Sequence, residues 1–313
     1  MALTVVGSIA FDSVRTPFGE RERMLGGSAV HVALAASFFT TVHVVGPVGS
    51  DFGDEHLELL RSRGVDTADI ERRGGETFFW RGHYDHDMNV AHTDDTRLNV
   101  FADFAPKLSG ESRSTDVLFL GNIQPQLQRE VRALSSPRLA ALDSMNLWIE
   151  TERDALCAAI AEVDCVLLND SEVRMLTDEP NLARAAQRLI AIGPRVVVAK
   201  RGEYGAALFT AERTFAIPGF LLEDVRDPTG AGDSFAGGFL GYLDAAGAEE
   251  PREPDLRRAM AYGTVLASFN VEEFGTERVA RLERDEVDAR YAELRAMTHF
   301  EEGIPTPPPP LSR

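Results

Sequence analysis

The chain has 313 residues, of which 44% are hydrophobic, and it is therefore long enough to bury a large core. Its 50 acidic and 32 basic residues give a formal charge of −18, which argues against nucleic acid or an anionic membrane surface as partners. No apolar run approaches membrane-spanning length, and the first residues do not resemble a signal peptide. We therefore expect a cytoplasmic protein.

Cysteine and lysine are both scarce. Cys157 and Cys165 lack the spacing of a metal or redox site, so we expect reduced, partly buried thiols. Only Lys107 and Lys200 occur, and arginine supplies the other positive charge. A high acid content with little lysine suits a salt-rich cytoplasm. A GC-rich genome would also favour arginine over lysine, and the sequence does not decide between the two.

The N-terminal segment predicts a strand, a hairpin and a helix. Residues 3–7 form a short apolar strand, and Asp12 follows where open α/β sheets bind ligands, although a turn aspartate is the alternative. The polar stretch 14–25 predicts an extended hairpin. Gly26 and Gly27 then open an apolar helix that reaches Ala36. A second strand at 42–46 and a helix ending near Gly64 come next.

Residues 77–104 interrupt this α/β pattern. Aromatic and polar residues alternate from Phe78 to Tyr84, and further short strands are expected at 89–93 and 98–101. This predicts a small β appendage. Its His and Asp cluster at 83–87 has adjacent spacing that fits a solvated turn better than a metal site.

From residue 114 the alternation of strands and helices resumes. Strands are expected at 117–121, 139–143 and 165–169, with helices at 126–134 and 150–161 between them. This order predicts parallel strands with helices on both faces. Asp143 and Asn146 follow a strand end and are candidates for the ligand cleft. A further strand, 195–200, ends in a glycine-spaced turn, and helices are expected at 256–270 and 285–297.

The most informative stretch is Asp227-Pro-Thr-Gly-Ala-Gly-Asp-Ser-Phe-Ala-Gly-Gly-Phe239. An apolar approach at 220–225 predicts a strand, and residues from Phe235 onward recur at helical spacing. The turn between them places two glycines at a helix N-terminus, where unpaired amides and the helix dipole favour an anion such as a phosphate. Asp233 would repel that anion unless it accepts a proton from an attacking hydroxyl. The alternative is that Asp233 caps the helix.

Three better-known motifs do not match this stretch. A Walker A loop requires a lysine, and a dinucleotide-binding fingerprint requires a third glycine where Phe235 stands. The segment around Ser234 lacks the last glycine of a nucleophile elbow.

The stretch from Asp227 to Phe235 instead resembles the C-terminal signature of the ribokinase-like (PfkB) carbohydrate and nucleoside kinases. This resemblance implies an α/β fold, a ribokinase-like three-layer sandwich with a central mostly parallel β-sheet, helices on both faces and a small β-sheet lid. The kinase domain would span residues 1–300, with lid segments at about 12–25 and 76–104, and residues 301–313 would form a Pro-rich tail. In that family the lid often forms a dimer surface, so a homodimer through the lid is implied.

The resemblance also implies roles for residues that bind the acceptor and the phosphoryl group. Asp233 would be the catalytic base, and the amides of Gly230, Ala231 and Gly232 would form the anion hole. The acceptor hydroxyls would be held by Asp12, Gly27, Ser28 and His31. Many family members have an asparagine at the position of His31, and a lone histidine on a helix is more often structural.

Nucleotide and metal roles follow from the same resemblance. Asn169 and Glu172 match an Asn-x-x-Glu motif that orders Mg2+ and its waters, although the same residues could cap a helix. The nucleotide-binding set would be Asn169, Lys200, Gly202, Gly205, Thr229 and Asn270, and surface solvation is the alternative for Lys200. The loop at 268–275 resembles the family's adenine edge and, in some members, a monovalent-cation (K+) site.

The predicted reaction is transfer of the ATP γ-phosphoryl group, with Mg2+, to a hydroxyl of a sugar or related polyol. The first alternative is a nucleoside kinase, in which the lid aromatics Phe78, Phe79 and Trp80 stack a base. A non-catalytic sugar or nucleotide sensor and a hydrolase using Ser234 fit the residues less well. The acceptor itself is not identified by the sequence.

Overall fold

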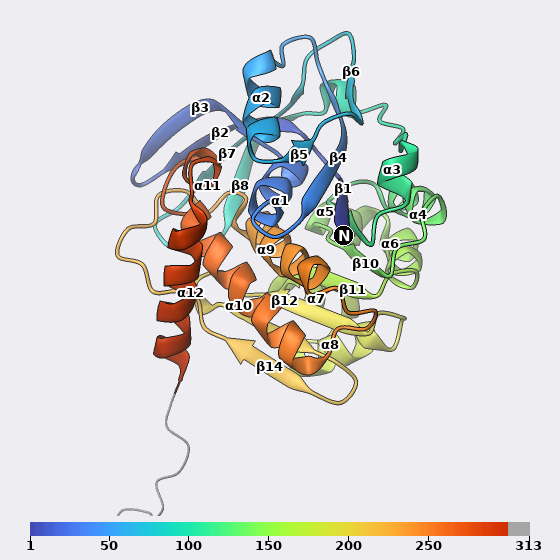
Figure 1. The fold of residues 1–313 in the computed structure, drawn as a ribbon, viewed down its shortest axis with the longest axis vertical. Coiled ribbons are helices and arrows are strands. Elements are labelled where there is room, and N and C mark those ends of the chain that lie inside the picture. The colour runs from blue at the N-terminus through green and yellow to red at the C-terminus, as the bar shows by residue number, and fades with distance from the viewer. Residues whose placement is uncertain (300–313) are drawn as a thin grey trace, which may run out of the picture.

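Within residues 1–299, which the computed structural model describes, ten strands form one central sheet (Figure 1). Their order is β14-β13-β12-β11-β10-β9-β1-β4-β5, and β6 also pairs with β4. All neighbours are parallel except for the antiparallel pairs that β13 makes with β12 and β14. The strands are β1 (Ala2–Val6), β4 (Thr41–Val48), β5 (Val65–Asp66), β6 (Ile70–Arg72), β9 (Val117–Leu120), β10 (Leu139–Leu142), β11 (Cys165–Asn169), β12 (Val196–Lys200), β13 (Ala206–Phe209) and β14 (Thr214–Ile217).

Helices cover both faces of this sheet, as predicted (Figure 1). Alternate residues of the strands belong to two apolar layers, one on each face of the sheet, because successive side chains of a strand point to opposite faces. One layer packs against α1 (Ser28–Ala36), α2 (Asp54–Ser62), α9 (Ala231–Ala246), α10 (Glu253–Asn270) and α12 (Arg284–Thr298). The other packs against α4 (Pro125–Ala133), α5 (Asn146–Thr151), α6 (Arg153–Ile160), α7 (Asp170–Thr177) and α8 (Leu182–Ile190). Short helices complete the set: α3 (Gly110–Arg113), α11 (Glu277–Ala280), η1 (Asn99–Phe101) and η2 (Gly202–Tyr204).

A second sheet of four strands lies apart from the central one, in the order β3-β2-β7-β8. It contains β2 (Ala10–Thr16), β3 (Gly19–Gly26), β7 (Phe78–Tyr84) and β8 (Ala91–Arg97). The expected hairpin at 14–25 is confirmed as the β2–β3 pair. The two lid segments therefore meet in one sheet through the parallel pairing of β2 with β7.

Three local predictions were wrong. Residues 220–225 form a loop rather than a strand, because Leu221 is 78% exposed and the amides of Arg226 and Asp227 bond to the carbonyl of Val271 beyond α10. The expected strand at 98–101 is the single turn η1. The expected helix at 150–161 is divided between α5 and α6, because the backbone of Glu152 leaves the helical region (φ −136°, ψ 37°).

The predicted tail at 301–313 lies outside the described residues. No helix of residues 1–299 is both long enough and apolar enough to cross a membrane. Cys157 and Cys165 are free thiols and are partly and fully buried, respectively, as expected.

Candidate active site

The carboxyl ends of β10, β11 and β12 bring predicted site residues to one edge of the central sheet. Asn169 and Lys200 end their strands as register partners, and Asp143 directly follows β10. The ammonium group of Lys200 donates to Asp143 Oδ2 at 2.5 Å, and the side chains are only 15% and 7% exposed. The alternative of a solvated surface lysine is therefore wrong.

Asn169 and Glu172 form a reciprocal capping box at the start of α7. The amide of Glu172 donates to Asn169 Oδ1 at 2.8 Å, and Glu172 Oε2 accepts from the amide of Asn169 at 2.7 Å. Burial, followed by the negative charge of Asp143, raises the pKa of Glu172 to about 7. The two residues thus do cap a helix, and they also place a buried carboxyl group beside Asp143 and Lys200.

The glycine-rich turn closes through a hydrogen bond from the amide of Ala231 to the carbonyl of Pro228 at 3.1 Å. Gly230 has φ 76° and ψ 0°, the conformation of the third residue of a type II turn, which favours glycine. Within residues 1–299, the amides of Gly230, Gly232 and Asp233 donate to no protein acceptor. The predicted anion hole included the amide of Ala231, but that amide closes the turn. The free amide of Asp233 lies beside those of Gly230 and Gly232 instead.

Asp233 is the third residue of α9 and does not cap it. The N-cap is Gly230, and no side chain accepts a capping hydrogen bond there. Burial, and then the charge of Asp143, raises the pKa of Asp233 to about 7, while Lys200 acts to lower it. A Cβ on Gly232 would lie 3.2 Å from Lys200 Nζ, so the ammonium group lies directly against the turn. A carboxyl group with a pKa near neutrality suits a general base.

Asp12 lies on β2 and is 6% exposed. Its Oδ2 accepts a hydrogen bond from the amide of Gly27 at 3.3 Å. Burial raises its pKa to about 7, and the charges of Asp227 and Asp233 contribute further. A Cβ on Gly26 would lie 1.9 Å from the Asp12 carboxylate. Any larger residue at this position would therefore clash with Asp12.

The other acceptor candidates lie at the start of α1. Gly27 is its N-cap with φ 89°, and a Cβ there would lie 2.5 Å from the carbonyl oxygen of Ser8. The Ser28 hydroxyl is buried and lies 3.2 Å from that of Ser8. His31 is 2% exposed, and its Nδ1 lies 2.9 Å from Oδ1 of Asn270. Asn270 is fully buried and its amide nitrogen donates to the Thr229 carbonyl at 2.7 Å, so its side chain supports the turn from within the protein.

The small sheet contacts both the turn and the predicted nucleotide loop. The Thr229 hydroxyl donates to the phenol oxygen of Tyr84, at the end of β7, at 3.2 Å. Asn89, between β7 and β8, donates to Glu203 Oε1 at 3.2 Å, and a Cβ on Gly202 would lie 2.7 Å from Asn89 Oδ1. Gly205 has φ 87° and packs against the backbone of 217–219. The small sheet thus covers this edge of the central sheet.

Sequence reasoning gave no role to two residues of the site. Asp227 is fully buried, and its carboxylate accepts from the amides of Thr229 and Gly275, both at 2.9 Å. The Asp-Pro-Thr sequence is a turn signal that could have suggested this role. Tyr84 was noted only as a lid residue, and no local signal places its hydroxyl on the turn. Its pKa is raised by burial and then by Asp227, Asp12 and Asp233.

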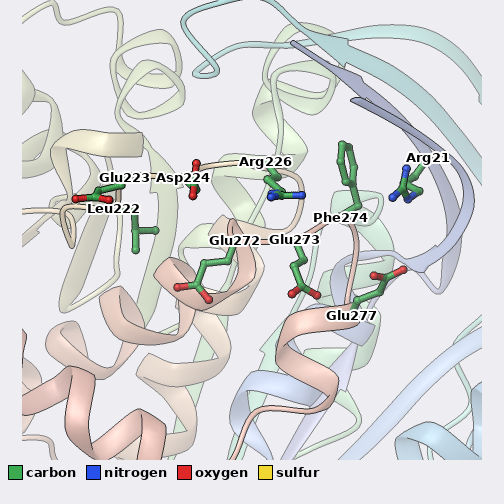
Figure 2. Close-up of a pocket in the computed structure, with 9 residues that line it drawn as sticks. All are labelled: Arg21, Leu222, Glu223, Asp224, Arg226, Glu272, Glu273, Phe274 and Glu277. Atoms are coloured by element: carbon green, nitrogen blue, oxygen red, sulfur yellow. The ribbon is translucent and has the colours of Figure 1, made fainter. Parts of the chain in front are cut away.

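A cavity of about 600 Å3 lies beside the turn, between β3, the 222–226 loop and the segment after α10. Figure 2 shows Arg226 on the loop and three glutamates, Glu272, Glu273 and Glu277, projecting from the facing segment. The lining residues are Arg21, Leu222, Glu223, Asp224, Arg226, Glu272, Glu273, Phe274 and Glu277. Glu272 is ion-paired with Arg278 and Arg290, and Glu273 is ion-paired with Arg281. The other three lining acids against two lining arginines leave this cavity only slightly more suitable for a cation than for a phosphate.

Comparison with known proteins shows the family to which the chain belongs. The profile of the pfkB family carbohydrate kinases matches residues 115–281. A cytidine kinase of Thermococcus kodakarensis is 30% identical over 263 residues, covering 82% of this chain and 94% of the relative. The chain belongs to the pfkB family. A nucleoside kinase of Methanothermobacter thermautotrophicus is 27% identical, covering 88% of this chain and 91% of the relative.

Solved structures confirm the ribokinase-like fold. The nucleoside kinase of Burkholderia thailandensis in complex with inosine gives a TM-score of 0.75 at 20% identity, covering 94% of this chain and 99% of that one. The ribokinase of Thermotoga maritima gives 0.74 at 20% identity, covering 94% and 99%. As a pfkB-family kinase, the protein uses ATP to phosphorylate a sugar or nucleoside hydroxyl.

Proposed function

We propose that the protein is a nucleoside kinase in which Asp233 deprotonates the acceptor hydroxyl as it attacks the γ-phosphorus of ATP. The pKa of about 7 supports this role, because Asp233 would be largely ionised just above neutrality and basic enough to accept the proton. The new O–P bond forms as the bond to ADP breaks, and the proton passes to Asp233. The free amides of Gly230 and Gly232, with that of Asp233, would stabilise charge on the transferring group.

The acidic edge of the sheet fits a magnesium ion. The charge of Asp143 acts to raise the pKa of both Glu172 and Asp233, and the charge of Lys200 acts to lower both. Residues 1–299 contain no cluster of three His, Cys, Asp or Glu side chains arranged for a metal. Mg2+ does not need such a cluster, because it keeps waters and substrate phosphates as ligands. Glu172 and Asn169 would hold the ion, which would neutralise phosphate charge when bound.

The preference for a nucleoside over a free sugar rests on Trp80. It is the register partner of Asp12 on adjacent strands, so the two side chains share one face of the small sheet. The indole lies over Gly82, where a Cβ would come within 2.3 Å of it. Phe78 stacks on Phe101, with centroids 5.5 Å apart, and is therefore already used in packing. Asp12 could thus hold ribose hydroxyls while Trp80 stacks the base.

Relatives support the same substrate class, since two of those compared above are a cytidine kinase and a nucleoside kinase. A sugar kinase is the second candidate, because a deoxyribokinase of Salmonella typhi is 23% identical over 264 residues. The two candidates differ in whether a base is required. Trp80 would matter for a nucleoside and would be of little consequence for a free pentose.

The test is ADP release from MgATP with cytidine, other ribonucleosides, ribose and deoxyribose as acceptors. We expect a ribonucleoside to be the best acceptor and Trp80→Leu to lower its kcat/KM about tenfold or more, because base–aromatic stacking is worth about 1–3 kcal/mol. Pentose phosphorylation by the variant should be unchanged. A pentose preferred by the wild-type protein would favour the sugar kinase instead.

The catalytic role of Asp233 is tested in the same assay. Asp233→Asn removes the proton acceptor but keeps the side-chain shape, so kcat should fall by about 100-fold to 10,000-fold without loss of the fold. Asp170→Asn on α7 is a matched control, since Asp170 forms an ion pair with Arg174 on the same helix. Near-normal turnover of Asp233→Asn would rule out the base assignment.

The proposal extends to a monovalent cation beside the turn. The cavity lined by acids lies next to Asp227, whose carboxylate joins the turn to the loop after α10. A K+ ion bound there would stabilise the contact between the turn and the loop after α10. Activity measured in K+, Na+ and tetramethylammonium salts at constant ionic strength would show whether K+ is required.

A further inference from the structure

Two buried side chains, His31 and Asn270, meet beneath the phosphate-binding turn although they are far apart in the sequence. His31 lies on α1, and Asn270 is the last residue of α10. They are 2% and 0% exposed, respectively. Together they contact the Thr229 carbonyl and Gly230 of the turn, and the side chain of Ser234 in the first turn of α9. His31, Asn270, Ser234 and Thr229 form one connected hydrogen-bond network.

The hydrogen bonds determine how the two side chains are oriented. The Thr229 carbonyl can only accept, so the group 2.7 Å from it must be the NH2 of Asn270. Asn270 Oδ1 is then an acceptor, and it receives the Ser234 hydroxyl at 3.0 Å. The same oxygen lies 2.9 Å from His31 Nδ1, so Nδ1 must carry a proton.

His31 is therefore a neutral imidazole protonated on Nδ1. Burial lowers its pKa to about 4, with Asn270 acting in the opposite direction, which keeps the ring uncharged at neutral pH. Its Nε2 is a buried lone pair without a hydrogen-bond partner in residues 1–299. The ring edge also lies against the turn, because a Cβ on Gly230 would come within 2.3 to 2.4 Å of it.

We propose that His31 and Asn270 are positioning residues that orient the peptide between Thr229 and Gly230 for phosphoryl transfer. In a trans peptide the C=O and N–H point in opposite directions. By holding the Thr229 carbonyl inward, Asn270 directs the Gly230 N–H outward, where it is free to bind the phosphoryl group. The Nδ1–H of His31 fixes the amide of Asn270. This inference rests on the proposed function, because it assigns a purpose to the same turn.

The test compares His31→Asn with His31→Leu. Both side chains lack the ring and have nearly the same shape, but only Asn places a donor where Nδ1 was. We expect kcat of the Leu variant to fall about fivefold below that of the Asn variant, since one hydrogen bond is worth about 1 kcal/mol. KM for ATP should agree within about twofold, because the turn acts on the transferring group. His43→Asn is the control, since His43 lies on β4 and pairs with Asp66.

A second readout does not depend on activity. The 15N chemical shifts of His31 in the free protein should show a protonated Nδ1 and an unprotonated Nε2 at neutral pH. The opposite tautomer would overturn the proposal, whether or not an acceptor has been found. Equal kcat values for the Asn and Leu variants in a well-folded protein would overturn it too. A protein that phosphorylates no acceptor, yet shows the expected tautomer, would contradict the proposed function and still support the hydrogen-bond arrangement.

Discussion

Replacing Asp12 by Asn should stabilise the protein while impairing acceptor binding. Asp12 is 6% exposed and accepts one hydrogen bond from the protein, from the amide of Gly27 at 3.3 Å. Burial raises its pKa from 3.8 to about 7, with Asp227 and Asp233 adding to the effect. The folded protein thus retains a proton that the unfolded chain releases. Ionising Asp12 therefore costs folding free energy.

The magnitude follows from the two pKa values. Stability linked to Asp12 is fully present below pH 3.8, is lost as pH rises, and reaches its lower limit just above pH 7. The complete loss is about 4 kcal/mol, and roughly 1 to 2 kcal/mol of it has already occurred at about pH 5. Asp12→Asn lacks this term. Its advantage over the wild-type protein should grow by about 2 to 3 kcal/mol between about pH 5 and about pH 8.

The assay is urea unfolding of both proteins at several pH values, with kinetics measured in parallel. Asp51→Asn is the control of opposite sign. Burial acts to raise the pKa of Asp51, but hydrogen bonds from Thr77 and Arg23 lower it overall. Stability linked to Asp51 is present above its unfolded pKa and lost as pH falls, so that variant should be destabilised most at neutral pH. A pH-independent difference between Asp12→Asn and wild type would refute the reasoning.

Two further substitutions test contacts around the turn. Tyr84→Phe removes the phenol oxygen that accepts from Thr229, and kcat/KM should fall about threefold to tenfold, as steady-state kinetics would show. An unchanged kcat/KM would mean that the small sheet does not support the turn through this bond. Lys200→Met leaves Asp143 buried without its partner, so the free energy of unfolding at neutral pH should drop by about 3 to 5 kcal/mol. The double variant with Asp143→Leu should recover most of that loss in urea unfolding, and a failure to do so would argue against the pairing.

The order of elements could be predicted because hydrophobic periodicity and turn residues are local signals. The strand ends at Asn169 and Lys200 follow from short apolar runs, and their meeting follows from parallel pairing. The loop at 220–225 was mistaken for a strand because its apolar residues carry no information about their partner. The amides of Arg226 and Asp227, which follow this loop, bond to the carbonyl of Val271, on a segment distant in the sequence.

The environment of the site residues was less predictable than their identity. From the sequence, a surface role and a phosphate-binding role were equally plausible for Lys200. No local pattern indicates that its ammonium group lies 2.5 Å from Asp143 Oδ2. The role of Ala231 was misplaced for a related reason. A turn motif predicts which amides lie near a bound anion. It does not show that the αL backbone of Gly230 turns the Ala231 amide toward the Pro228 carbonyl. Asn270 was expected at the nucleotide, and only the packing of α10 reveals that its amide is used within the protein.

The raised pKa values connect stability to function at this site. Asp12, Glu172 and Asp233 each have a pKa of about 7 because burial deprives their carboxylates of water. Proteins seldom retain such groups unless they are useful, since each ionised form is destabilising. A hydroxyl donor beside Asp12 and a cation beside Glu172 would supply the missing partners. Substrate binding would thus offset the free-energy cost of ionising Asp12 and Glu172. Asp233 would remain the carboxylate that is free to accept a proton.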